Sequence, residues 1–225
     1  MYELLVGETS DRGKETKVLL DWTDPDLLRE LLRRRFVFGS GLPDTSSFED
    51  VWRAITISHL AGEESSQYVI DRCLMRPRAL LDLVGHCRSV AINLRHQRIE
   101  QEDFEKGLQA FSTDLLSEIN LEIRDILPAA ENVVYEFIGE KAMLPAAELD
   151  SILEKVSASA PERDAFAELL LWYGVLGVVR LDGDVSYIYS VNYDMARLRG
   201  IISKLSETSL VYAINPAFAA ALESR

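Results

Sequence analysis

The sequence predicts a mainly α-helical chain, in which a helical bundle is followed by three helices and a β-hairpin. With 225 residues, 48% of them hydrophobic, the chain is long enough to bury a substantial core. Apolar residues recur at helical spacing through most of residues 23–126. The clearest β signal is two β-rich runs after residue 174, joined by an Asp-Gly pair typical of hairpins. We therefore expect a strand-containing lead-in over residues 1–22, the bundle over 23–127 and a second domain over 128–225.

The bundle region divides into five predicted helices after a short strand at 18–20. The first begins at Thr23-Asp24-Pro25, where a capping side chain precedes a proline. It is followed by a loop over 38–47. Further helices are expected at about 48–61, 64–74, 77–95 and 99–126. Cys87 falls on the apolar stripe of the fourth helix and is expected to be a core residue rather than a reactive thiol.

The second domain shows a change of pattern after Pro128. Helices are expected at 129–138, 145–156 and 161–173, and strands at 176–181 and 185–191. Three helices followed by a hairpin is the element order of a winged helix, a variant of the helix-turn-helix. A helix at about 193–205 and a strand-then-helix segment at 210–222 complete the expected domain.

Composition and missing motifs narrow the function. The chain has 37 Asp and Glu against 24 Lys and Arg, a net charge of -13, which repels phosphate backbones unless basic residues cluster. It has neither a membrane-length apolar run nor a secretory signal, so we expect a cytoplasmic protein with no membrane partner. Two cysteines at this spacing match no zinc signature, and phosphate-binding glycine loops are missing. We expect no metal, no cofactor and no enzymatic activity of this chain alone.

Four segments, in this order, resemble the C-terminal half of P-loop ATPases of the AAA/STAND type, a group often found in bacterial defence loci. They are residues 18–35, the run RPRALL at 76–81, the run RIEQEDF at 98–104 and the run YAINPAF at 212–218. The resemblance implies a helical lid followed by a winged helix. The nucleotide-binding core of such an ATPase would lie upstream, since the residues before 18 leave no room for it. ATP and Mg would therefore reach this chain only through that absent core.

The same resemblance assigns a role to two arginines. Residues 76–81 look like the start of the lid helix that carries the sensor-2 arginine. Arg78, or else Arg76, would then reach the γ-phosphate of a nucleotide held by an ATPase core and stabilise charge during phosphoryl transfer. The alternative is an arginine that pairs with surface acids, for little net energy.

Two other sets of residues are candidates for binding. Arg33, Arg34 and Arg35 form the densest basic run and could contact DNA or phosphate, although arginines at a helix end commonly complement the helix dipole. The aromatic residues Trp172, Tyr173, Tyr187 and Tyr189 are explained mostly by core packing, and any exposed remainder would mark a protein interface.

The winged helix raises the question of DNA binding. Its third helix begins Glu162-Arg163-Asp164, and the hairpin tip carries Asp182 and Asp184, so both usual DNA-contacting surfaces are acidic. We therefore expect a non-catalytic regulatory and protein-interaction module that couples the nucleotide state of a core to assembly, with an ATPase core or partner subunits as its partner. The alternative is a winged-helix DNA-binding regulator that uses a basic surface elsewhere.

Overall fold

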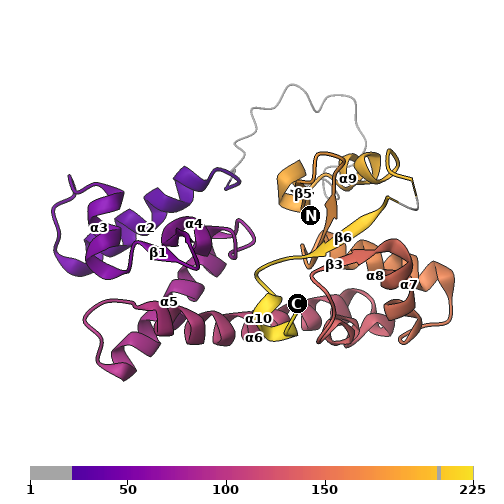
Figure 1. Cartoon of the computed structure of the whole chain (residues 1–225), viewed down its shortest axis with the longest axis horizontal. Coiled ribbons are helices and arrows are strands. Elements are labelled where there is room, and N and C mark those ends of the chain that lie inside the picture. The colour runs from indigo at the N-terminus through magenta and orange to yellow at the C-terminus, as the bar shows by residue number, and fades with distance from the viewer. Residues whose placement is uncertain (1–21, 207–208, 225) are drawn as a thin grey trace.

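The computed structural model describes residues 22–206 and 209–224, which form two lobes joined by one long helix (Figure 1). The helical lobe contains α2 (Pro25–Ser40), α3 (Phe48–Ile55), α4 (Ser65–Ile70), α5 (Pro77–Leu94) and the first half of α6 (Gln101–Ile126). The sheet lobe comprises residues 127–224 and packs on the second half of α6. The predicted strand at 18–20 lies outside the described residues.

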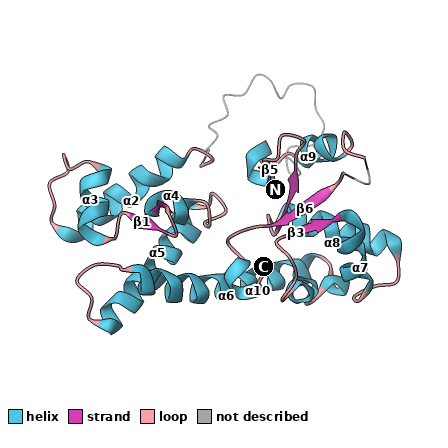
Figure 2. Ribbon diagram, viewed as in Figure 1, coloured by secondary structure: helices cyan, strands magenta, loops and turns pink. Residues whose placement is uncertain are grey.

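The fold is mainly helical with small antiparallel sheets, as the sequence predicts (Figure 2). The start of α2 is also confirmed, because the Asp24 carboxylate accepts a hydrogen bond from the Asp26 amide at 2.9 Å. The helix ends at Gly41, whose φ of 71° lies in the left-handed region that glycine adopts easily. Among the described residues, no helix is long and apolar enough to cross a membrane.

The helix predicted at 48–61 is shorter than expected. It stops at Ile55, and a hairpin of β1 (His59–Leu60) and β2 (Glu63–Glu64) follows. The cause is a distant segment: the Ile99 amide donates to the Ile55 carbonyl at 2.8 Å, and the Ile57 amide donates to the Ile99 carbonyl at 3.1 Å. This tertiary pairing holds the backbone extended at Thr56, directly after the helix. The helix predicted at 64–74 is likewise reduced to α4, with Glu64 as its N-cap.

Helices α5 and α6 form the tightest helix pair of the molecule. The chain reverses between them at Arg95, which has a φ of 61° and caps α5. Helix α6 then begins with reciprocal bonds between Glu100 and Asp103, a capping box. At their contact, a Cβ added to Gly107 would lie 2.6 Å from the Cα of Cys87. The two backbones therefore approach so closely that only glycine fits. Cys87 is fully buried there, which confirms it as a core residue.

The sheet lobe begins with a correction. The helix predicted at 129–138 is replaced by two 3-10 turns, η1 (Pro128–Ala130) and η2 (Val133–Phe137). Between them Asn132 has a φ of 68°, which interrupts helical geometry. Its amide donates to the Asn120 side chain on α6 at 3.0 Å, so the contact with α6 fixes the break.

The rest of the lobe is built on a four-stranded antiparallel sheet. Its elements in chain order are β3 (Met143–Pro145), α7 (Ala146–Glu154), α8 (Ala160–Trp172), β4 (Leu176–Val179), β5 (Val185–Ser186), η3 (Ile188–Val191), α9 (Met195–Ile202), β6 (Val211–Ile214) and α10 (Ala219–Leu222). The predicted hairpin is present as β4 and β5, but its second strand ends at Ser186 and continues as η3. The strand order is β3-β6-β4-β5, so the C-terminal strand lies between β3 and β4.

One continuous hydrophobic core runs through both lobes. Leu74, at the end of the segment before α5, lies within 3.8 Å of the position that a Cβ on Gly174 would occupy. At the other end of the lobe contact, the Ala221 amide of α10 donates to the Ser112 hydroxyl of α6 at 3.0 Å. The core and these contacts tie the two lobes together at both ends of their junction.

Candidate docking groove

The two arginines proposed as nucleotide sensors occupy different environments at the start of α5. Arg76 is the N-cap residue and is partly buried, and its charge acts on the hydroxyl of Tyr173 in the sheet lobe. Arg78 is 92% exposed and lies 3.7 Å from the Asp82 carboxylate on the same helix. Arg76 therefore borders the junction between the lobes, whereas Arg78 faces solvent.

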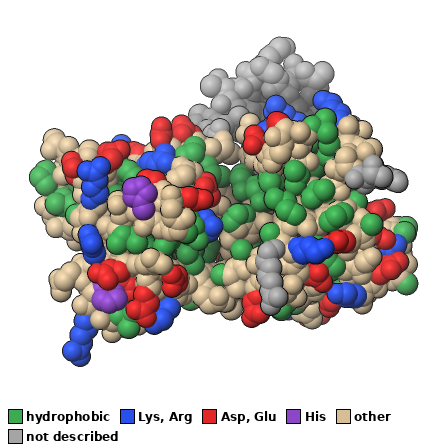
Figure 3. Space-filling view, viewed as in Figure 1, with side chains coloured by type: hydrophobic (Ala, Val, Ile, Leu, Met, Phe, Trp, Pro, Cys, Tyr) green, Lys and Arg blue, Asp and Glu red, His purple; other side chains and the backbone are tan. Residues whose placement is uncertain are grey.

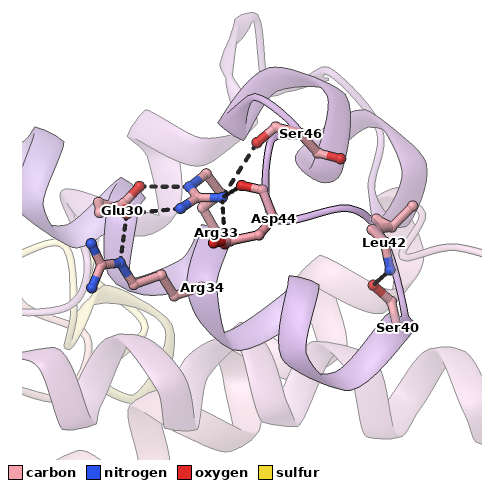
Figure 4. Close-up of polar contacts among 7 residues, drawn as sticks. All are labelled: Glu30, Arg33, Arg34, Ser40, Leu42, Asp44 and Ser46. Carbon is pink, nitrogen blue, oxygen red and sulfur yellow. Dashed lines mark hydrogen bonds and ion pairs between the residues drawn. The ribbon is translucent and has the colours of Figure 1, made fainter.

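Two arginines of the basic run on α2 pair with the same acid, Glu30, and the third does not. Arg33 is 15% exposed; its guanidinium donates to the Glu30 carboxylate at 2.7 Å and to the Asp44 carbonyl at 2.7 Å (Figure 4). Arg34 donates to the same Glu30 at 2.6 Å. These bonds, that from Arg33 foremost, lower the pKa of Glu30 to about 2. Among the residues that the structure describes, Arg35 has no such acidic partner, and it lies on a groove.

That groove lies between the C-terminal end of α2 and one face of α5, and has a volume of about 850 Å³. We call it the α2–α5 groove. Leu32 and Val84 are buried where they line it. Two large apolar side chains on its lining stand in solvent: Phe38 is 88% exposed and Ile92 is 57% exposed. The groove is the size of a ligand or peptide site.

The charged side chains on the groove are mostly basic. Arg35, Arg88 and Arg98 line it, and none of them makes an ion pair with any residue in 22–206 or 209–224. Among the described residues that line the groove, the acidic one is Asp82, and it also pairs with Arg78. In a chain of net charge -13, this local excess of positive charge is unusual.

His96 also lines the groove, and its charge is balanced by a neighbouring acid. Its Nδ1 donates to a carboxylate oxygen of Asp103 at 2.9 Å, and Asp103 is fully buried. The Asp103 hydrogen bond is the main cause that raises the pKa of His96 above its ordinary value, and the nearby charges of Glu100 and Glu102 act in the same direction. His96, in the turn between α5 and α6, therefore both bonds to α6 through Asp103 and lines the groove.

The aromatic residues proposed for a protein interface are mostly internal. Tyr173 is 7% exposed, so it belongs to the core and not to an interface. Tyr187 and Tyr189 stack with ring centres 5.3 Å apart, and the Tyr189 hydroxyl accepts a hydrogen bond from Asn215 at 3.1 Å. Trp172 is 39% exposed, which makes it the accessible member of the predicted set.

The basic residues on the two surfaces expected to contact DNA, the start of α8 and the β4–β5 hairpin, are paired with neighbouring acids. Arg163, the base in the first turn of α8, is 12% exposed and donates to Asp150 at 2.7 Å. Arg180 in the hairpin pairs with Asp182 at 3.1 Å and with Asp184 at 2.8 Å. On the face drawn in Figure 3, basic and acidic side chains are interspersed rather than segregated. Within the described residues, both arginines of these surfaces are therefore engaged with acids.

The thiols are unsuited to nucleophilic chemistry. Burial raises the pKa of Cys73 to about 11 and that of Cys87 to about 12, so both stay protonated near neutral pH. Within the described part of the chain, no three His, Cys, Asp or Glu side chains come together in a way that could hold a metal ion.

Residues 26–120 match the family model of the FunZ-associated C-terminal helical domain. No curated protein and no solved structure matches the chain. The matched segment covers α2 to α5 and most of α6, so it contains the whole α2–α5 groove. The helical lobe is thus similar to a helical domain associated with FunZ C-terminal regions. The match includes no phosphate-loop core, and the AAA/STAND resemblance remains a prediction.

Sequence reasoning missed the groove because its lining comes from segments far apart in the chain. Signals were nevertheless present. Phe38 was expected in the loop over 38–47 but lies beside Gly39 in the last turn of α2, and Ile92 departs from the buried stripe of α5. An apolar residue that the helical pattern does not need is an indicator of an external contact.

Proposed function

We propose that this chain is a non-catalytic protein-interaction module of the kind found at the C-terminal side of a P-loop ATPase, and that it docks a partner protein in the α2–α5 groove. The observation that supports this most is the combination, on the segment that resembles a C-terminal helical domain, of exposed apolar side chains and arginines that have no acidic partner within residues 22–206 and 209–224. Interfaces are typically anchored by apolar and arginine side chains of this kind.

The position of α5 suggests how nucleotide state would be coupled to docking. This helix has 18 residues and so spans about 27 Å. Arg76 and Arg78 stand at its first turn, and the groove runs along its later turns. A core that pulled on either arginine would move the groove wall as part of the same rigid helix. Under this proposal, ATP and Mg bind the core, and the arginines act on them from outside.

The alternative, a DNA-binding winged helix, has less support. The arginines of α8 and of the hairpin are already paired with acids. A basic surface elsewhere could include Arg197, Arg199 and Lys204, in and just after α9, but Arg199 is paired with Glu168 at 2.7 Å. Arg197 and Lys204 remain, which is fewer than the several phosphate contacts that productive DNA binding uses.

Affinity purification tests the proposal directly. The tagged full-length chain is expressed in the organism that encodes it, as wild type, as Ile92→Gln in the groove and as Leu121→Gln, a control at an exposed apolar residue on α6. We expect the wild type and the control to capture a protein with a phosphate-loop motif, identified by mass spectrometry, and the groove variant to lose it.

Two results would count against it. Capture of the same proteins by wild type and Ile92→Gln would remove the groove from the interaction. Micromolar binding of the purified chain to duplex DNA that weakens steeply between 50 and 200 mM salt would favour the DNA-binding alternative; these concentrations are on the order of those at which phosphate contacts are usually diagnosed.

A further inference from the structure

We infer that the occupant of the α2–α5 groove is an acidic, amphipathic α-helix of a partner protein. This inference rests on the proposed function only in taking the groove as a protein-docking site. It is carried by three independent features: a glycine that the fold does not need, the shape of the α5 face, and the sign of the surrounding charge.

Gly85 is the first feature. It lies in the interior of α5 and lines the groove, and a Cβ added there would meet no atom within 4 Å. Its backbone is not in the left-handed region either. Glycine in a helix interior is unfavourable relative to alanine. The fold therefore gains nothing from Gly85, whereas a helix that packs closely across α5 would need the absence of a side chain.

The second feature is the length and pattern of the α5 face. The residues of α5 that line the groove run from Leu81 to Ile92. Eleven residue steps correspond to about 16 Å, or three helical turns. With the end of α2 as the opposite wall, this face has the geometry of a helix-in-groove site, in which anchors at i, i+3, i+4 and i+7 enter between two helices.

The third feature is charge. Arg35, Arg88 and Arg98 come from α2, from α5 and from the turn before α6, so they surround the groove instead of lying on one side. Their lack of acidic partners in the described chain leaves them available to an external carboxylate. A helix with apolar anchors flanked by Glu or Asp would satisfy both the exposed side chains and the arginines. A basic amphipathic helix would be repelled.

Two synthetic peptides of about 18 residues, enough to span three turns with flanking residues, provide the probe. Both carry Leu at the four anchor positions and are blocked at their ends. One has Glu at the exposed positions and the other has Lys. Binding to the full chain is measured by fluorescence anisotropy at low salt. We expect the Glu peptide to bind, the Lys peptide not to bind, and the affinity for the Glu peptide to fall as salt rises.

Variants locate the binding. Arg35→Glu, Arg88→Glu and Arg98→Glu should each weaken binding of the Glu peptide by about tenfold, as expected for loss of a charge pair at an interface. Arg197→Glu, at an arginine outside the groove on α9, is the matched control and should leave the affinity unchanged.

Gly85→Leu separates a binding role from a structural one. Leucine is the better helix former, so the melting temperature should not fall, while binding of the Glu peptide should weaken by at least about tenfold because the new side chain fills the groove. Gly200→Leu is the control: Gly200 also lies inside a helix, α9, with no atom within 4 Å of an added Cβ. That variant should bind the peptide as the wild type does.

Equal binding of the two peptides, or unchanged affinity of Gly85→Leu and the arginine variants, would overturn the inference. Two outcomes distinguish a failure of this inference from a failure of the proposed function. If the chain captures a phosphate-loop protein through Ile92 but binds no Glu peptide, the groove docks a partner of other chemistry. If the Glu peptide binds as described but no phosphate-loop protein is captured, the inference holds and the ATPase assignment is wrong.

Discussion

The two faces of α5 meet two glycines with opposite surroundings: Gly107 of the neighbouring α6 packs against one face, and Gly85 lies on the other face of α5 itself. On the side of α6, the helix packs so closely that an added Cβ on Gly107 would lie 2.6 Å from the Cys87 Cα. On the groove side, an added Cβ on Gly85 would touch nothing. Internal packing thus explains the glycine at the closed face and leaves the glycine at the open face unexplained. A residue that the fold does not require, placed in a groove, points to a contact outside the chain.

The largest expected effect comes from a substitution at the close contact between α5 and α6. Gly107→Ala should lower the free energy of unfolding by about 3 kcal/mol, since the added methyl must displace backbone atoms of α5. Urea denaturation followed by circular dichroism measures it. Cys87→Ala in the same chain should not rescue the loss, because the clash is also with the Cα and the amide nitrogen of Cys87. A loss below about 1 kcal/mol would mean that the helices separate easily.

On the groove face of α5, an alanine substitution should increase the stability of the fold instead of reducing it. Gly85→Ala should raise the free energy of unfolding by about 1 kcal/mol, the usual helix-propensity difference between the two residues. The measurement is the same urea transition, with wild type run in parallel. A destabilised Gly85→Ala variant would show that this position has an internal packing partner, and the contrast between the two faces would disappear.

Helix α2 offers a similar comparison between Arg33 and Arg35. Arg33 holds the loop after α2 through Asp44 and pairs with Glu30, whereas Arg35 has no acidic partner in the described part of the chain. At pH 7, Arg33→Ala should lower the Tm and Arg35→Ala should leave it within error. Because the pKa of Glu30 is lowered from 4.5 to about 2, its share of the stability is complete above pH 4.5 and lost as the pH falls toward 2. The Tm difference between wild type and Glu30→Gln should shrink over that interval.

The smallest expected effect lies at His96, which bonds to α6 and also lines the α2–α5 groove. Its pKa is raised by the bond to Asp103, so the folded state favours protonated His96. The stabilisation is therefore complete below the ordinary pKa of 6.5 and is lost as the pH rises through the raised value. The Tm advantage of wild type over His96→Gln should be greater at pH 5.5 than at pH 8.5, two conditions roughly one to two units on either side of that range. An advantage independent of pH would show that the bond does not depend on the imidazolium charge.

The parts of the fold predicted well are those with local causes. The cap at Asp24, the long apolar stripes of α5 and α6, and the Asp-Gly hairpin turn at Gly183 are each encoded within a few residues. The errors have distant causes. Pairing with Ile99 ends α3 at Ile55, and a bond from Asn132 to Asn120 on α6 accompanies the break in the helix predicted at 129–138.

For the candidate site, the sequence identified Arg35 as part of a basic run but could not distinguish it from Arg33 and Arg34. That distinction depends on which arginine reaches Glu30 and the loop at Asp44. It also could not assign Tyr173 to the core, because an aromatic residue at a helix end is compatible with either location.

By itself, the sequence determined the mainly helical character, the acidic charge balance and the positions of most helix starts, because propensity, capping and periodicity act over one or two turns. Only the tertiary structure decided that β6 lies between β3 and β4, that α5 has one closed and one open face, and that three arginines from separate segments surround one groove. These features are set by contacts between residues far apart in the chain, whose geometry no local pattern records.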